Sequence, residues 1–177
     1  MKRPLGFKER AFIVVIIFPI ALIAGAILTE VAEPQGHVIT SSPHLYLTIG
    51  FNFTTGLDQY FPANFTIPAD LNVVFTITNY DNATNPLSDQ FGIVTGTVGG
   101  TATIDGQTVN KIPGSRISHT FSILPLGVNV PIPGRSTVTF TLIVEQAGSF
   151  HWNCMAPCDP ESMSTPGFMQ GTMTVGA

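Results

Sequence analysis

Short runs of strand-forming residues, separated by turn residues, fill the chain from residue 44 onward. The clearest run is 71–79, in which Val73, Phe75 and Ile77 fall on one face of an extended chain. Similar runs span residues 44–49, 64–68, 116–124, 136–145, 149–153 and 171–175. No helical period follows residue 30. About seven short strands with turn signals between them predict an all-β sandwich.

The connecting segments carry turn chemistry. Residues 80–88 are rich in Asn, Asp and Pro, which favour turns. Residues 90–103 alternate weakly and lead into Asp105-Gly106, a hairpin signal. We therefore expect this part of the chain to form a ribbon inserted into the sandwich.

The N-terminus predicts the topology. A basic flank, residues 1–10, precedes an uncharged apolar run over residues 11–28, and 18 residues just suffice to span a bilayer. We predict a retained transmembrane anchor over residues 11–30 with its basic flank in the cytoplasm. The alternative is a cleaved signal peptide, whose apolar core is usually shorter and followed by a small-x-small cleavage site. No convincing cleavage site follows here.

The rest of the chain is then extracytoplasmic. Residues 31–43 form a polar linker, and residues 44–177 form one external domain on a single-pass anchor in the cell membrane. Three Asn-x-Thr tripeptides agree with this location and make Asn52, Asn64 and Asn82 glycosylation candidates. Charged residues make up only 10% of the chain, against about 25% in ordinary soluble proteins. The net charge of −4 gives no reason to expect nucleic acid as a partner.

A loop rich in sulfur follows the run at 149–153. It holds both cysteines of the chain, Cys154 and Cys158, together with several methionines, and thiolate and thioether ligands select copper over harder ions. Two lone cysteines in an oxidising compartment also predict a disulfide. Zinc would lack its usual four ligands, since only His151 is nearby. Copper would need a ligand from a distant strand, and His119 is available; all three interpretations stay open.

The segment from Arg116 to Val175 resembles the cupredoxins, most closely the CuA domain of subunit II of haem-copper terminal oxidases. The resemblance is carried by a strand histidine, His119, followed by the Cys-x3-Cys pair. Residues 133–140, 147–150 and 169–175 resemble the family's strands around the site. The resemblance implies a cupredoxin-like Greek-key β-sandwich with copper as cofactor.

Carried over residue by residue, the resemblance implies a ligand set. His119 would be the first imidazole ligand, and Cys154 and Cys158 the two bridging thiolates. The main-chain carbonyl of Ala156 and the thioether of Met169 would be weak ligands.

The sequence departs from the family at one ligand. Ser162 stands four residues past Cys158, where the family has its second histidine, and no histidine follows His151. His151 is a poor substitute, because three residues before Cys154 it should point to the opposite face of the strand. A single-copper site would use His119, the thiolates, and Met163 or Met169. Without metal, Cys154 and Cys158 would form a disulfide.

Two classes of function follow. In the first, the chain is a subunit II-like part of a respiratory terminal oxidase. It would pass electrons from an external donor protein or quinol to integral membrane subunits carrying haem or, if copper-free, serve a structural or docking role in a quinol-oxidase type complex. In the second, it is a stand-alone, membrane-anchored copper carrier akin to sulfocyanin.

A surface sandwich without metal is a further alternative. The low charge, the three Asn-x-Thr tripeptides and the anchor together suggest an archaeal cell surface. Trp152, just before the first cysteine, is either an exposed aromatic through which electrons enter or a core residue beneath the loop. No nucleophile–base pair or phosphate-binding loop indicates an enzyme with its own hydrolytic chemistry.

Overall fold

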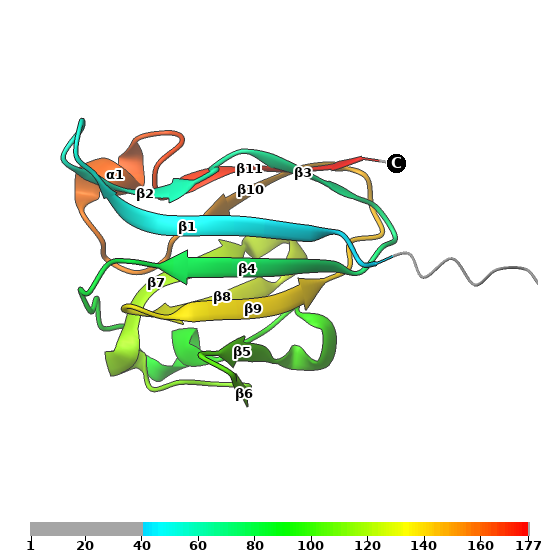
Figure 1. Cartoon of the computed structure of the whole chain (residues 1–177), viewed down its shortest axis with the longest axis horizontal. Helices are drawn as coiled ribbons and strands as arrows, with labels where there is room; N and C mark the ends of the chain where they lie inside the picture. Colours follow the sequence, from blue (N-terminus) through cyan, green and yellow to red (C-terminus); the bar gives the residue numbers. More distant parts are fainter. Residues whose placement is uncertain (1–40, 177) are drawn as a thin grey trace, which may run out of the picture. The chain divides into compact units, whose positions relative to one another are not determined.

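The computed structural model describes residues 41–176, which form a domain of two packed β-sheets (Figure 1). The strands are β1 (His44–Asn52), β2 (Leu57–Phe61), β3 (Phe65–Pro68), β4 (Val73–Asn79), β5 (Ala102–Ile104), β6 (Gln107–Val109), β7 (Ile117–Ile123), β8 (Val128–Pro133), β9 (Thr137–Leu142), β10 (Gly148–Asn153) and β11 (Gln170–Gly176). One short helix, α1 (Pro160–Ser164), and four 3₁₀ turns complete the described elements.

The predictions for the basic flank, the transmembrane anchor and most of the linker concern residues 1–40, which lie outside the described residues. Within residues 41–176, no helix has the length and apolar character needed to cross a membrane.

The two sheets differ in their strand order. The six-stranded sheet runs β2-β1-β4-β9-β5-β6, and the five-stranded sheet runs β3-β11-β10-β7-β8. Strands β1 and β4 pair in parallel, as do β3 and β11, whereas the other pairs are antiparallel. The chain therefore crosses between the sheets instead of winding as a simple meander.

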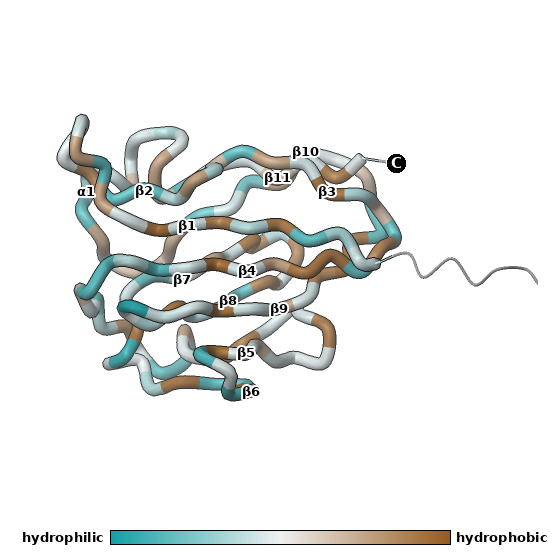
Figure 2. The backbone as a smooth tube through the Cα atoms, in the orientation of Figure 1, coloured by the Kyte–Doolittle hydropathy of each residue, from teal (hydrophilic) through white to brown (hydrophobic). Residues whose placement is uncertain are grey.

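The core lies between the sheets and follows from the alternation in the sequence. In β4, Val73, Phe75 and Ile77 are buried, while the residues between them are only half-buried. Figure 2 shows hydrophobic positions recurring along β1 and β4 in the same way. Phe75 stacks on Phe140 of β9 with ring centroids 5.1 Å apart, and Phe121 of β7 meets it from the facing sheet at 5.8 Å. The predicted all-β sandwich is confirmed.

The structure adds three elements that the sequence patterns did not predict. Strand β8 contains Pro131 and Pro133, but it lies at a sheet edge, where a missing N–H costs no ladder bond. Strand β2 is also an edge strand, and most of its residues are half-buried. Helix α1 has five residues, too few to show a period. It begins after Asp159, whose carboxylate accepts the Ser162 N–H at 2.8 Å as an N-cap.

The two ends of the sandwich are formed by different segments of the chain. The β1–β2 turn, helix α1 and the segment after β4 gather at one end, on the left in Figure 1. The start of β1 and the end of β11 lie at the other end. The sulfur-rich loop between β10 and β11 therefore belongs to the end that carries α1.

Candidate metal centre

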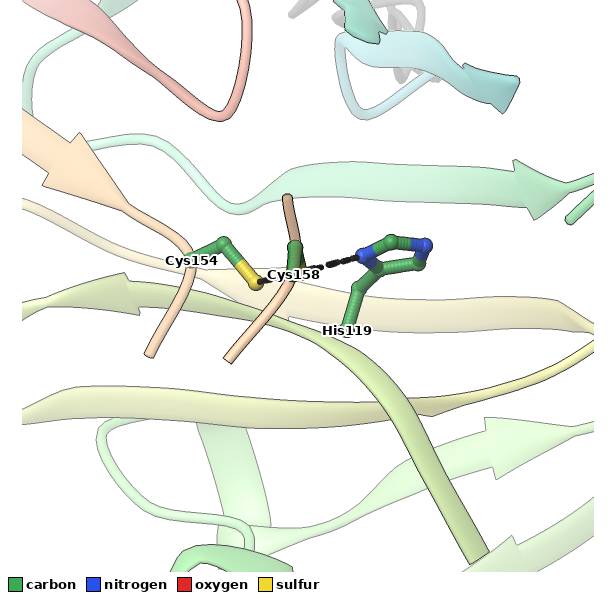
Figure 3. Close-up of side chains that lie close together, drawn as sticks. All are labelled: His119, Cys154 and Cys158. Carbon is green, nitrogen blue, oxygen red and sulfur yellow. Dashed lines mark hydrogen bonds between the residues drawn. The ribbon is translucent and has the colours of Figure 1, made fainter. Parts of the chain in front are cut away.

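His119 lies in the middle of β7, and its side chain is fully buried. Its Nδ1 atom is 3.0 Å from Sγ of Cys158 and 4.0 Å from Sγ of Cys154. Figure 3 shows the imidazole pointing toward the two cysteines, which come from a separate part of the chain. The prediction that a distant strand brings a histidine to the cysteine loop agrees with this geometry.

Both cysteines are free thiols buried at this end of the sandwich. Their Sγ atoms lie 3.3 Å apart, and one ligand atom from each of His119, Cys154 and Cys158 lies within 4.8 Å of the others. Within residues 41–176, this is the one group of three or more His, Cys, Asp or Glu side chains gathered closely enough to hold a metal ion. The predicted disulfide between the two cysteines stays a prediction for the oxidised protein.

Backbone hydrogen bonds fix the cysteine loop. The N–H of Cys154 donates to the carbonyl of Met169 at 2.8 Å, which joins the two ends of the loop. The N–H of Thr120 on β7 points to Sγ of Cys154 at 3.4 Å, and the Thr120 hydroxyl accepts the N–H of Met155 at 2.7 Å. The loop is therefore attached to the strand that carries His119, so the three ligand atoms are held together by backbone contacts.

Asp81 completes the site and was not predicted from the sequence. The Nε2–H of His119 donates to Oδ2 of Asp81 at 3.0 Å, and the N–H of Ala83 donates to Oδ1 at 2.9 Å. A ring nitrogen bonded to a carboxylate carries the proton, which directs the other nitrogen to the metal. Asp81 falls in the segment predicted only as a turn, 38 residues before His119 in the sequence. One signal was present: Asp81 follows the end of the most central predicted strand.

The ionisation states reflect these contacts. Burial lowers the pKa of His119, but hydrogen bonds to Asp81 and Cys154 outweigh it and raise the pKa to about 9. The hydrogen bond from His119 lowers the pKa of Asp81 to about 2. Burial opposes ionisation of Cys154, yet hydrogen bonds from Cys158 and His119 bring its pKa well below the usual thiol value. The hydrogen bond with Cys154, together with burial, raises the pKa of Cys158.

The predicted weak ligands lie in the loop itself. Ala156 is buried, and its carbonyl is 3.9 Å from Sγ of Cys154 while it accepts the N–H of Cys158 at 2.7 Å. Met169 is buried, and its main-chain carbonyl accepts the N–H of Cys154. Met163 is half-buried on α1 against the core. Their roles as ligands stay predictions.

The place expected for a second imidazole is occupied by a structural serine. Ser162 is fully buried; its hydroxyl donates to Asp159 Oδ2 at 3.0 Å and accepts the N–H of Asp58 at 3.1 Å. His151 is exposed on β10, as expected from its position three residues before Cys154. Among the described residues, His119 is therefore the one imidazole at the site.

Trp152 lies in the core and is not the exposed aromatic that one sequence interpretation required. Its side chain has no exposed surface, its Nε1–H donates to the carbonyl of Ala63 at 2.8 Å, and its ring contacts Tyr60 and Phe121. Trp152 is the buried residue of β10, and its neighbour His151 faces outward, as the alternation along a strand requires. The structure agrees with the other interpretation, in which Trp152 is a core residue beneath the loop.

The three glycosylation candidates differ in exposure. Asn64 and Asn82 are exposed, whereas Asn52 is half-buried with its amide donating to Gln59 Oε1 at 2.8 Å. Glycosylation of all three stays a prediction.

The donor set fits copper. Two sulfur atoms and one imidazole nitrogen form a soft set of the type that copper prefers, and the carboxylate on the far ring nitrogen is the usual outer partner of a metal-binding histidine. The cluster of His119, Cys154 and Cys158 can hold a copper ion. Zinc would require a fourth ligand to complete its tetrahedral site.

Comparisons with known proteins return structural likenesses alone. No protein-family model matches the chain, and no curated protein matches it. Among solved structures, a reduced auracyanin from Roseiflexus castenholzii is 15% identical with a TM-score of 0.42, covering 77% of this chain and 98% of that one. The metal binding domain of the Cu(I) exporting P-type ATPase CopA of Streptococcus pneumoniae is 9% identical with a TM-score of 0.42, covering 76% and 85%. These likenesses are distant.

Proposed function

We propose that this domain binds one copper ion through Nδ1 of His119 and the Sγ atoms of Cys154 and Cys158 and carries electrons. The observation that supports this most directly is the meeting of these three atoms within 4.8 Å in a buried position. Bound copper would supply one-electron chemistry between its two oxidation states.

The residues of the chain provide what an electron carrier needs. Burial of all three side chains keeps water from the ligand atoms, which limits solvent reorganisation when charge changes. His119 sits on a strand with every residue buried, and the cysteine loop is bonded to that strand by Thr120. The ligand atoms are therefore held by rigid elements in both charge states.

The ligand count favours one copper over two. A pair of copper ions bridged by both thiolates would need a second terminal imidazole, and that position holds the hydrogen-bonded Ser162. The second candidate function is therefore a stand-alone electron carrier with a single copper, and the buried Ser162 is the observation that supports it.

The setting that we propose is a membrane-anchored, extracytoplasmic subunit of a respiratory terminal oxidase. The Cys-x3-Cys spacing after a strand histidine and the apolar run over residues 11–28 support it. Its partners would be haem-carrying membrane subunits and an external donor protein or quinol. If the domain proves copper-free, a docking role in such a complex takes its place.

The test is metal content on the full chain purified in detergent, with visible absorption and EPR spectra before and after copper loading and a count of free thiols. We expect one copper per chain, intense thiolate-to-copper absorption and two free thiols in the metal-free protein. The hyperfine pattern in the EPR spectrum separates one copper from a mixed-valence pair.

Two histidine variants provide a matched comparison. His119→Gln removes the buried imidazole and should abolish the absorption band, whereas His151→Gln removes an exposed imidazole on β10 and should leave it unchanged. Equal spectra for both variants, or a wild-type chain that stays colourless with no free thiols, would reject the copper site.

A further inference from the structure

We infer that Asp81 is a positioning residue that fixes His119 with Nδ1 toward the two thiols and lowers the reduction potential of the bound copper. This inference rests on the proposed copper site. It concerns a residue from another part of the chain, on the loop that follows β4, and it goes beyond the three ligands.

The contact between the two side chains is direct and largely shielded. The Nε2–H of His119 donates to Oδ2 of Asp81 at 3.0 Å; the imidazole is fully buried and the carboxylate is 19% exposed. A hydrogen bond to an ionised acceptor is about twice as strong as one between neutral groups, and low local polarity strengthens it further. Turning the ring over about its Cβ–Cγ bond would lose this bond and would direct Cδ2, which cannot bind a metal, to the thiols. Asp81 therefore holds the ring in the orientation in which Nδ1 faces the metal.

The carboxylate is itself held in place. The N–H of Asp81 donates to Oδ1 of Asn79 at 3.0 Å, and its carbonyl accepts the N–H of Arg135 at 2.8 Å. The side-chain amide of Asn79 donates to the carbonyl of Pro133 at 2.9 Å. The N–H of Ala83 donates to Oδ1, the second carboxylate oxygen of Asp81. These bonds tie the loop to the end of β4 and to the turn between β8 and β9. The carboxylate is thus oriented before any metal binds.

The effect on the metal follows from charge. A carboxylate that accepts the Nε2 proton increases the electron density on the ring, which makes Nδ1 a stronger donor. A stronger donor stabilises the more highly charged copper ion more than the less charged one. Reduction is therefore less favourable than at a site whose histidine bonds a neutral group.

The matched variants are Asp81→Asn and Asp58→Asn. Each removes one carboxylate from this end of the domain, but Asp58 makes no hydrogen bond to His119; its backbone N–H instead binds Ser162. Copper(I) affinity is measured by competition with a chelator, and the potential by redox titration of the copper-loaded full chain. For Asp81→Asn we expect copper affinity to fall 10- to 100-fold, with the larger loss for copper(II). Each tenfold difference between the two oxidation states raises the potential by about 59 mV.

Asp58→Asn should change the affinity by less than about threefold, because this half-buried carboxylate acts on the site through its charge and not through a hydrogen bond to His119. Equal shifts in the two variants would show a general charge effect and overturn the inference, as would an unchanged potential in Asp81→Asn. Asp81→Glu, which restores the charge, should recover part of the loss.

Nitrogen NMR of the wild-type chain loaded with copper(I) keeps the inference testable if Asp81→Asn does not fold. We expect a proton on Nε2 of His119 and none on Nδ1; the reverse assignment would overturn the inference. A wild-type chain that binds no copper would reject the proposed function instead. In that case the metal-free protein still reports on the contact, because the Nε2–H should exchange slowly in the wild type and rapidly in Asp81→Ala.

Discussion

Trp152 and Gly171 occupy opposite positions on β10 and β11, and the indole lies across the glycine. A Cβ atom at residue 171 would lie 2.8 Å from Nε1 of Trp152 and would overlap the carbonyl of Ala63, which accepts the indole N–H. The glycine thus leaves room for the hydrogen bond that holds the tryptophan beneath the cysteine loop.

Gly171→Ala should therefore destabilise the domain by about 1–3 kcal/mol, the usual range for overpacking in a tight core. The measurement is the urea midpoint of the metal-free protein. Gly176→Ala is the matched control on the same strand, since its nearest neighbour would be Thr66 Cγ2 at 4.0 Å. Similar midpoints for the two variants would show that the Ala63 carbonyl and the indole can both move without loss.

The sequence predicted the strands with clear alternation and missed those without it. The buried set in β4 recurs every second residue, so 71–79 identified the centre of the sheet. Strand β8 was not predicted; it contains Pro131 and Pro133, and its position at a sheet edge explains how they are accommodated. Local patterns do not report whether a strand lies at an edge.

The site was predictable by ligand chemistry but not by its outer contacts. The sequence predicted Cys154, Cys158 and His119 as ligands because thiolates select copper and because a strand histidine followed by Cys-x3-Cys resembles a known copper site. Asp81 was missed because an aspartate in a turn has many ordinary roles, and its contact with His119 depends on how the loop after β4 packs against β7. The burial of Trp152 depends in the same way on β3 and β11 lying next to each other.

Ser162 is expected to stabilise the cysteine loop. Ser162→Ala leaves the Asp58 N–H without its acceptor and removes a hydroxyl from the Asp159 carboxylate. Leaving a buried polar group without a hydrogen-bond partner costs about 1–3 kcal/mol of folding free energy. A less stable loop should also release copper(I) faster to an added chelator. Ser164→Ala, on the exposed side of the same helix, is the control. Equal release rates for the two variants would assign Ser162 no role in holding the loop.

Acid should remove the stabilising effect of Asp81 in the metal-free protein. Its pKa is about 2 in the folded state against 3.8 for the unperturbed side chain, so the folded state binds fewer protons between these values. The contribution is then complete above pH 3.8 and is lost as the pH falls through 2. We expect the urea midpoint of the wild type to exceed that of Asp81→Asn at pH 5, and the difference to shrink toward pH 2. A difference that stays constant over this range would contradict the assignment of the low pKa to Asp81.

Met169 and Met163 are the alternative thioether ligands, and leucine variants distinguish them. Leucine nearly conserves the volume of methionine, so each substitution should cost less than about 1.5 kcal/mol and leave one copper bound. Met169 is buried next to Cys154, whereas Met163 is half-buried on α1. We therefore expect Met169→Leu to raise the reduction potential of the copper and Met163→Leu to leave it unchanged. The rise follows because the loss of a donor disfavours the more highly charged copper ion. A shift confined to Met163→Leu would assign the thioether to α1, and no shift in either variant would leave His119 and the two cysteines as the complete side-chain ligand set.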